Sequence, residues 1–246
     1  MRLIFLEKKN IKEGLYFLSF EDSKHVFANR YKINDRIKAV MDDKIGEFII
    51  KKINNKIVFG SFIPTSSLSL SKYNLNLIIG LPKDRALNPI IEKSSEIGVN
   101  MILIIPLEFS DRKSISEKNI NRLNRIAKEA CMQSGNPYLP KIVNLLKIEE
   151  LLSIKELSDG YKIFLDEKSE VKLDFFDIIK NNPIEKFKNL NIFVGPEGGI
   201  SDNERSFLIK IGFQPISLGE NILRTETAAI SSAFFFKLFQ KNVFKF

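Results

Sequence analysis

The chain has 246 residues, of which 44% are hydrophobic and 28% charged, an ordinary composition for one large folded domain or two smaller ones. It contains one cysteine, Cys131, and one histidine, His25, which excludes a disulfide framework and a Cys/His zinc site and disfavours Ser-His-Asp or Cys-His catalysis. No apolar run approaches about 20 residues and the N-terminus shows no cleavable signal, so we expect a cytoplasmic protein without a membrane span.

The net charge of +8 is concentrated near the N-terminus. Residues 1–73 carry 14 basic and 8 acidic side chains, whereas residues 74–246 carry 24 basic and 22 acidic ones. A basic N-terminal part beside a nearly neutral larger part favours a module that binds a polyanion. A general bias of the sequence towards lysine, asparagine and isoleucine is the open alternative.

The N-terminal part predicts short strands separated by turn residues, a spacing typical of a small barrel or sandwich. The predicted strands are Lys38–Met41, Glu47–Ile53 and Lys56–Ile63. The uncharged, Ser-rich stretch Pro64–Ser71 then predicts a linker.

The rest of the chain alternates apolar strands with helices, which predicts a parallel sheet covered on both faces. The predicted strands are Leu75–Leu81, Met101–Pro106, Lys162–Asp166, Asn191–Val194 and Pro215–Leu218. The predicted helices are Pro89–Ile97 with Asn88 as N-cap, Glu117–Ser134, and a last one that begins near Thr225.

A first glycine-bearing segment, Gly195–Ser201, follows one of these strands, and Ser201 and Glu204 have capping-box spacing for the next helix. Glycines at the carboxyl end of a parallel strand let a ligand approach the backbone closely, and ligands bind at this edge of such sheets. The segment is neither a Walker loop nor a G-x-G-x-x-G fingerprint, and Glu197 disfavours a phosphate ligand. A simple turn therefore remains the alternative.

A second segment, Ser217–Ala229, leads from the last predicted strand into the last helix. Thr225, Glu226 and Thr227 suit the start of a helix. Helix capping does not account for Ile222 and Leu223 beside a glycine, and such an apolar pair suits the wall of a slot for a flat ligand.

Two further groups of residues are candidates for RNA contact. The helix Glu117–Ser134 places Arg122 and Arg125 on one face, which is typical of a solvated surface and also suits contact with RNA phosphates. In the basic N-terminal part His25 and Arg30 flank a possible short helix, where a packed or surface histidine is the alternative.

In chain order these motifs closely resemble the ribosomal RNA small subunit methyltransferase E family, the 16S rRNA (uracil-N3)-methyltransferases of the SPOUT superfamily. Gly195–Ser201 and Leu218–Ala229 resemble the family's G-P-E-G-G-F-S and L-G-x-R-I-L-R-T-E-T-A-A almost residue for residue. Weaker similarities cover Met1-Arg2, His25–Arg30, Pro82–Val99, Asp111-Arg112 and Arg122–Gly135. Pro89, Met132, Asn136 and Asn221 stand where the family usually has Trp, Glu, Arg and Arg.

The resemblance implies an α/β fold in which a small PUA-like RNA-binding β-barrel, residues 1–70, precedes a SPOUT methyltransferase domain, residues 74–246, whose parallel sheet carries a deep trefoil knot. It implies a homodimer without a metal that uses S-adenosyl-L-methionine to methylate N3 of one uridine of 16S rRNA, uridine 1498 in the standard numbering, in the small ribosomal subunit or a precursor. A SPOUT enzyme for another RNA position or a ribose 2′-OH, and a non-catalytic RNA-binding assembly factor, are the alternatives.

Roles for individual residues follow from the motifs and the resemblance together. The expected cofactor-binding residues are Leu165, Val194, Gly195, Pro196, Glu197, Gly198, Gly199, Ile200, Leu218, Gly219, Ile222, Leu223, Arg224, Thr225 and Thr227. The expected RNA-binding residues are Arg2, His25, Arg30, Arg112, Arg122 and Arg125.

The expected catalytic residues are Glu226 and Arg224. Because uracil N3 must lose its proton when it attacks, a base is needed, and Glu226 is the candidate. Arg224 would orient this base or stabilise negative charge on the uracil oxygens. Helix capping is the alternative for Glu226.

Overall fold

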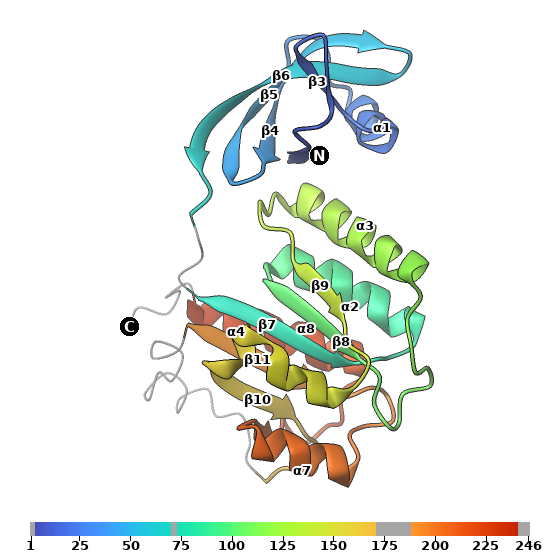
Figure 1. Ribbon diagram of the computed structural model, residues 1–246, viewed down its shortest axis with the longest axis vertical. Coiled ribbons are helices and arrows are strands. Elements are labelled where there is room, and N and C mark those ends of the chain that lie inside the picture. Colours follow the sequence, from blue (N-terminus) through green and yellow to red (C-terminus); the bar gives the residue numbers. More distant parts are fainter. Residues whose placement is uncertain (1–2, 70–72, 171–187, 241–246) are drawn as a thin grey trace. The chain divides into compact units, whose positions relative to one another are not determined.

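The computed structural model describes residues 3–69, 73–170 and 188–240. The chain divides into two compact units, each with a hydrophobic core of its own (Figure 1). The first unit comprises Met1–Leu70 and Lys128–Tyr138, and the second comprises Ser71–Ala127 and Leu139–Phe246. The sequence predicts a single division of the chain, after residue 70. It does not predict that Lys128–Tyr138 belongs to the first unit.

The first unit is built on a six-stranded sheet with the strand order β1-β4-β5-β6-β3-β2. Its elements are β1 (Ile4–Leu6), β2 (Ile11–Lys12), β3 (Leu15–Phe17), α1 (Phe20–Ala28), β4 (Arg36–Met41), β5 (Lys44–Asn54) and β6 (Ile57–Ser67). Phe48 and Ile50 of β5 and Val26 of α1 are fully buried in its core. The first two strands predicted for this part lie within β4 and β5, and the third, Lys56–Ile63, overlaps β6 at every residue but Lys56, so the three predicted strands are confirmed.

The predicted linker Pro64–Ser71 is wrong over its first half, because β6 continues to Ser67. Ser66 and Ser67 pair with Ile45 and Lys44 of β5, and Thr65 Oγ1 donates to the Ile45 carbonyl at 3.1 Å. Pro64 has no N–H to donate, and it lies at a register shift of the ladder, where a proline is tolerated. The exposed end of β6 is rich in serine and threonine, and this composition resembles that of a linker.

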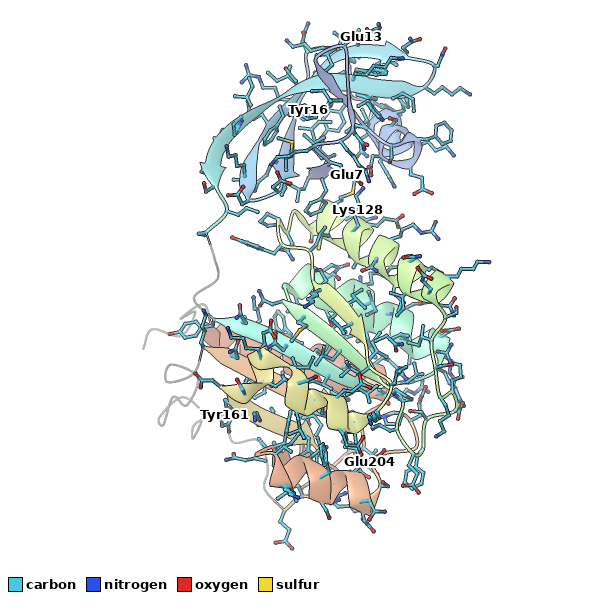
Figure 2. All side chains as sticks on the ribbon, in the orientation of Figure 1. Glu7, Glu13, Tyr16, Lys128, Tyr161 and Glu204 are labelled. Atoms are coloured by element: carbon cyan, nitrogen blue, oxygen red, sulfur yellow. The ribbon has the colours of Figure 1, made fainter. Side chains whose placement is uncertain are left out.

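Helix α3 (Glu117–Ser134) was predicted with the same bounds, and its last turns belong to the first unit. Met132 is buried in the core of that unit, and its carbonyl accepts from the Leu3 N–H at 3.2 Å. Lys128, labelled in Figure 2, lies 2.9 Å from a carboxylate oxygen of Asp22, whose side chain is buried. An apolar Met132 in place of the family's glutamate thus has a packing reason.

The second unit contains a six-stranded sheet in which every neighbouring pair is parallel, which confirms the predicted parallel sheet. Its strands, in sheet order, are β12 (Gln214–Ile216), β10 (Tyr161–Leu165), β11 (Asn189–Val194), β7 (Asn74–Gly80), β8 (Met101–Ile105) and β9 (Lys141–Asn144). Successive side chains of these strands alternate between two cores. On β7, for example, Leu77 and Ile79 enter one core and Ile78 enters the other.

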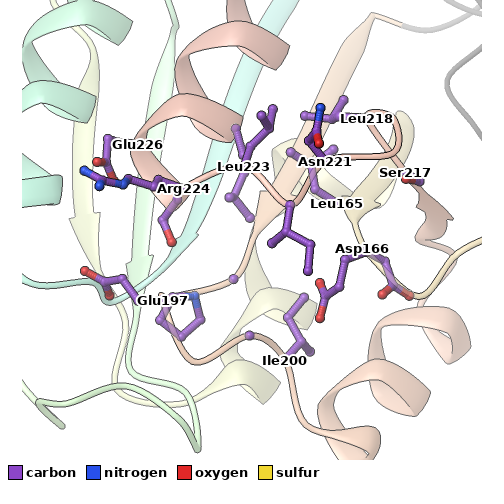
Figure 3. A pocket seen from close by; sticks show the side chains of 18 of the residues that line it. Leu165, Asp166, Glu197, Ile200, Ser217, Leu218, Asn221, Leu223, Arg224 and Glu226 are labelled. Carbon is purple, nitrogen blue, oxygen red and sulfur yellow. The ribbon is translucent and has the colours of Figure 1, made fainter.

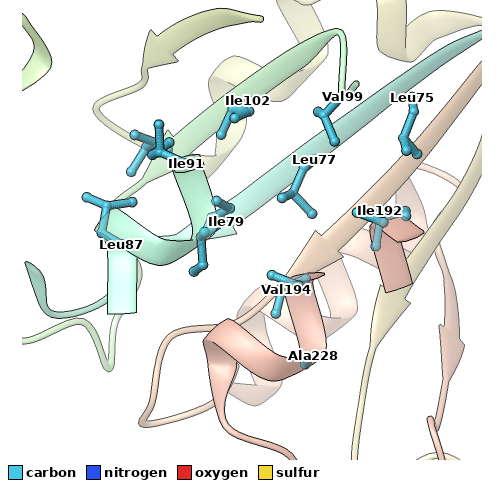
Figure 4. Close-up of a cluster of buried hydrophobic side chains, with 14 of the residues drawn as sticks. Leu75, Leu77, Ile79, Leu87, Ile91, Val99, Ile102, Ile192, Val194 and Ala228 are labelled. Carbon is cyan, nitrogen blue, oxygen red and sulfur yellow. The ribbon is translucent and has the colours of Figure 1, made fainter. Parts of the chain in front are cut away.

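Helices cover both faces of this sheet (Figure 1). One core is closed by α2 (Asp84–Ile97), α3 and α8 (Thr225–Gln240), and Figure 4 shows strand side chains of this core packed together with Leu87, Ile91 and Ala228. The other core is closed by η1 (Ile148–Ser153), α4 (Lys155–Ser158) and α7 (Asp202–Lys210). Because both faces of the sheet are covered, side chains on both faces are apolar, and the sequence of each strand is a continuous apolar run.

Helix α2 begins at Asp84, so the prediction that it starts at Pro89 with Asn88 as its cap is wrong. Pro89 lies inside the helix, where its ring removes one backbone donor. The buried residues Ala86 and Leu87 hold the earlier turn in place by packing, and Asn88 Oδ1 accepts a hydrogen bond from Arg122 of α3 at 2.9 Å. Packing in the folded protein therefore makes the helix begin earlier than the local sequence predicts.

The register between β7 and β11 is reinforced by paired asparagines. Asn74 pairs with Asn189 and Asn76 with Asn191 along the ladder, and their side-chain amides are hydrogen-bonded at 2.9 and 2.8 Å. A slip by one residue would break both bonds and turn the apolar residues to the wrong face. These pairs fix where β11 ends, and hence the position of the segment that follows it.

Candidate functional site

A cavity of about 800 Å³ lies in the second unit at the carboxyl ends of β10, β11 and β12. The residues that line it are Arg85, Leu165–Glu167, Val194–Ile200, Ser217–Glu226 and Ala228. Ligands of parallel α/β sheets bind at this edge, where the strands end and loops converge. The structure therefore brings together the two glycine-bearing segments singled out in the sequence (Figure 3).

Every residue expected to bind a cofactor lines the cavity except Thr227. Thr225 is 6% exposed and lines the cavity together with Ala228, three residues further along α8. Thr227 is exposed and lies on another side of the helix, because successive residues are rotated by about 100°. Thr227 is therefore a surface residue of α8 and not part of the cavity wall.

The segment Gly195–Ser201, which we call the β11 loop, is packed so tightly that side chains would not fit at Gly195 or Gly198. A Cβ atom on Gly195 would come within 2.8 Å of Ile200 Cγ1, and one on Gly198 within 2.7 Å of Phe109 Cβ. The Gly199 N–H closes a turn by donating to the Pro196 carbonyl at 2.9 Å. At the end of the loop Ser201 forms the predicted capping box with Glu204, which confirms that motif.

Glu197 is held by the start of α2. Its carboxylate accepts from the backbone N–H of Lys83, with Oε1 at 3.1 Å, and this N–H stands at the positive end of the α2 dipole. Glu197 therefore has a structural partner, and its presence in a glycine-rich turn is explained without a phosphate ligand.

The segment Ser217–Arg224, which we call the β12 loop, is packed less tightly, and residues 219–224 are exposed. Ser217 Oγ donates to the Gly219 carbonyl at 2.9 Å, and a Cβ atom added to Gly219 would meet nothing within 4 Å. Ile222 is 81% exposed and Leu223 39% exposed, although both line the cavity. Two apolar side chains that face an open cavity provide surface for an apolar ligand group.

Acidic side chains outnumber basic ones in the cavity wall. The acidic residues are Asp166, Glu167, Glu197, Glu220 and Glu226, and the basic ones are Arg85 and Arg224. Asp166 is buried and forms an ion pair with Arg205 of α7, which fixes its carboxylate. The remaining excess of negative charge favours a ligand that carries positive charge.

Arg224 and Glu226 stand at the entrance to helix α8, and their side chains extend to the same side of the cavity (Figure 3). The Arg224 carbonyl accepts from the Ala228 N–H at 2.8 Å, so the helix starts there. Glu226 lies in the first turn and is half-buried, a position that the helix dipole favours for a carboxylate. The two residues thus place one positive and one negative group at the wall of the cavity.

Sequence reasoning missed seven lining residues: Arg85, Asp166, Glu167, Ser217, Glu220, Asn221 and Ala228. Four of these, Ser217, Glu220, Asn221 and Ala228, lie within the segment Ser217–Ala229 that the sequence already singles out, and Glu167 directly follows the predicted strand Lys162–Asp166. Asp166 ends a predicted strand, which was a usable signal for a site residue. Arg85 is more than 100 positions from both loops, and only the fold brings it to the cavity.

The residues expected to contact RNA fall in different places. Arg2 lies outside the described residues, His25 is half-buried on α1, and Arg30 is exposed after that helix. Arg125 is exposed on α3. Arg112 donates to Asp84 at 2.9 Å and Arg122 to Asn88 at 2.9 Å, so each of these guanidinium groups has a partner within the second unit.

Within residues 3–69, 73–170 and 188–240, no group of three or more His, Cys, Asp or Glu side chains is arranged to hold a metal ion. No helix in the same part of the chain combines the length and apolarity needed to cross a membrane.

Comparison with known proteins places this geometry in context. A family model described as "RNA methyltransferase domain" matches residues 69–236. The ribosomal RNA small subunit methyltransferase E of Buchnera aphidicola is 31% identical over 92% of this chain and 89% of its own length. That of Borreliella burgdorferi numbered 1 is 27% identical over 95% of this chain and 96% of its own.

A solved structure shares the fold. The ribosomal RNA small subunit methyltransferase E of Neisseria gonorrhoeae, bound to S-adenosyl methionine, superimposes with a TM-score of 0.77. It is 24% identical and covers 95% of both chains. The similarity therefore covers both units, and not only the sheet that carries the cavity.

Proposed function

The chain belongs to the ribosomal RNA small subunit methyltransferase E family, and on this basis we propose that it transfers a methyl group from S-adenosyl-L-methionine to N3 of one uridine of 16S rRNA, uridine 1498 in the standard numbering. It is an RNA methyltransferase. The observation that carries the proposal is that two loops more than 15 residues apart, each matching a family motif, line one cavity of about 800 Å³.

The residues present fit S-adenosyl-L-methionine. The cavity volume is within the range of about 300–1,000 Å³ that small-molecule sites occupy. The glycines of the β11 loop line the cavity and carry no side chain that would stand between the backbone and a ligand, while Ile222 and Leu223 offer an apolar surface for the adenine ring. When bound, the cofactor supplies an electrophilic methyl group on a positively charged sulfur, and the acidic excess of the wall suits that charge.

The protein's contribution to this reaction is mainly positioning, because methyl transfer from a sulfonium requires in-line attack and little covalent help. Holding two reactants in the reacting geometry supplies roughly 7–11 kcal/mol in favourable cases. The packed β11 loop is suited to that task, since it is already fixed by contacts on several sides.

Glu226 and Arg224 have complementary roles in the proposal. The Glu226 carboxylate accepts the proton of uracil N3, which makes the nitrogen nucleophilic. The Arg224 guanidinium donates to a uracil oxygen, where negative charge develops as the proton leaves. Both side chains extend to the same side of the cavity (Figure 3), as these roles require.

The first unit is proposed to be a PUA-like barrel that binds the phosphates around the target through groups such as His25 and Arg30. Arg112, Arg122 and Arg125, which are partly or fully exposed on the second unit, are proposed for the same contact. Arg2 is proposed for the same task, on its sequence match alone. The second unit is proposed to carry the deep trefoil knot of SPOUT enzymes and to form a homodimer. The substrate is the small subunit or a precursor, which places the reaction in the cytoplasm.

Mass spectrometry of nucleosides tests the proposal. The purified full chain and S-adenosyl-L-methionine are incubated with small subunits from cells that lack this methylation, and the RNA is then digested. The proposal predicts 3-methyluridine at one position of 16S rRNA. A methylated ribose, a different methylated base, or RNA binding without any methyl transfer would contradict it.

A further inference from the structure

Phe109 is an exposed aromatic side chain beside the cavity that the proposed function does not use. It is 48% exposed and belongs to the segment Leu107–Lys113, which follows β8 and which we call the β8 loop. Within the described residues its ring stacks on no other ring and on no cation. Phe20, which is exposed to the same degree, differs in that Lys24 Nζ lies 4.5 Å from its ring centre.

The β8 loop is fixed by hydrogen bonds on both sides of Phe109. Leu107 N–H donates to Ser110 Oγ at 3.0 Å, and Lys113 Nζ donates to the Leu107 and Glu108 carbonyls at 2.7 and 2.6 Å. Glu108 N–H donates at 2.8 Å to the carboxylate of Glu204, which forms the capping box of α7 with Ser201 and is labelled in Figure 2. Phe109 is therefore carried on a rigid support, which lowers the entropy lost when a ligand binds to its ring.

The β8 loop touches the cavity wall at Phe109. A Cβ atom on Gly198 would lie 2.7 Å from Phe109 Cβ and 2.9 Å from its carbonyl oxygen. Gly198 lines the cavity, so Phe109 Cβ and its backbone lie against the cavity wall, and the exposed ring is attached at that point although Phe109 is not itself a lining residue. Arg85 lines the same cavity and forms no ion pair within the described part of the chain, so it is available for a phosphate.

We propose that the Phe109 ring stacks on the base next to the target uridine and so positions the RNA strand at the cavity. The inference rests on the proposed function. Because uracil N3 belongs to the base-pairing edge, the target must be unpaired and turned out of the helix before it can react. Its neighbour then loses a stacking partner, and an exposed aromatic ring on a rigid loop replaces that partner. Phe109 is thus a positioning residue.

Three variants of Phe109 separate stacking from simple apolar contact. Phe109→Ala removes the ring and is expected to lower kcat/KM for RNA on the order of tenfold to a hundredfold, the range for loss of one stacked base. Phe109→Leu keeps an apolar side chain without a π-face and is expected to resemble Phe109→Ala. Phe109→Tyr keeps the ring and is expected to resemble the wild type. The affinity for S-adenosyl-L-methionine should be unchanged in all three.

A matched control is Leu152→Ala, which removes an apolar side chain that is 67% exposed on η1 and does not line the cavity. It should leave RNA kinetics unchanged. Thermal unfolding of each variant checks that the fold is intact.

An RNA with an abasic nucleotide beside the target uridine completes the test. If Phe109 stacks on that base, Phe109→Ala and the abasic site have the same effect, and combining them causes little further loss. The proposal for Phe109 is overturned if the losses in kcat/KM from Phe109→Ala and from the abasic site add when the two are combined. It is also overturned if the Phe109→Leu enzyme equals the wild type. If the wild type makes 3-methyluridine in the same assay, the proposed function is supported whatever the Phe109 variants do. If the wild type makes none, both the proposed function and the role of Phe109 are overturned.

Discussion

The two loops that form the cavity differ in how the protein holds them. The β11 loop is packed against Phe109, joined through Glu197 to the start of α2, and closed by a capping box at Ser201. The β12 loop has open space around Gly219, and its Ile222 is 81% exposed. One wall of the site is therefore organised before a ligand arrives, whereas the other presents apolar surface that a ligand would cover.

The β11 loop, as the fixed wall, and the β12 loop, as the open wall, therefore contribute to binding in different ways. A fixed wall lowers the entropy lost on binding and holds the reacting atoms in place. An open wall gains hydrophobic free energy only when a ligand covers it. Substitutions at the packed glycines of the β11 loop should therefore disturb both folding and binding, whereas truncation of an exposed side chain of the β12 loop should affect mainly binding or catalysis.

The largest effect on activity is expected at Glu226, in the first turn of α8 just after the β12 loop. Glu226→Gln keeps the shape of the side chain but removes its ability to accept the N3 proton, so kcat should fall about 10²- to 10⁴-fold. Binding of S-adenosyl-L-methionine and thermal stability should stay near wild type. Single-turnover methylation together with calorimetry measures both quantities, and a variant that methylates at the wild-type rate would remove Glu226 as the base.

The next effect concerns the fixed wall. Gly198→Ala forces a Cβ atom to 2.9 Å from the Phe109 carbonyl oxygen, which is backbone and cannot turn aside. We expect a loss of about 1–3 kcal/mol in unfolding free energy and weaker cofactor binding. Denaturant unfolding and calorimetry on the same sample measure the two losses.

The matched variant for that test is Gly219→Ala in the open wall. Its Cβ atom would meet nothing within 4 Å, and only the backbone φ of 140° opposes it. The cost should be smaller, on the order of 1 kcal/mol. If both variants lose the same stability, the two loops are not held differently.

A smaller effect is expected from Ile222→Ala. Because Ile222 is 81% exposed, truncation should change the unfolding free energy by less than about 0.5 kcal/mol. Cofactor affinity should fall by about 1–2 kcal/mol if adenine covers this side chain. Thermal unfolding and calorimetry separate the two effects, and an unchanged affinity would show that Ile222 is no part of the binding wall.

The smallest effect on binding is expected from Ser201→Ala. Loss of the capping box should cost about 1 kcal/mol of unfolding free energy, since one N-cap hydrogen bond to α7 disappears. The other contacts of the β11 loop remain, so cofactor affinity should change less than twofold. A large loss of affinity would mean that the capping box, and not the packing at the glycines, holds the fixed wall.

The sequence predicted the parallel sheet because fully buried strands read as continuous apolar runs, and it predicted the cavity because both loops carry glycines at strand ends. It missed the start of α2, where packing of Leu87 holds a turn that Pro89 would otherwise end. It also missed the grouping of Lys128–Tyr138 with the first unit, because local patterns do not encode contacts between residues 100 positions apart. Arg85 was missed for the same reason.

The central claim, that the β11 and β12 loops together bind one molecule of S-adenosyl-L-methionine, is tested most directly by calorimetric titration of the full chain, Gly198→Ala, Ile222→Ala and the double variant. The account predicts one cofactor bound per chain, with weaker binding when either loop is altered. No binding by the wild type, or binding that neither substitution changes, would contradict it.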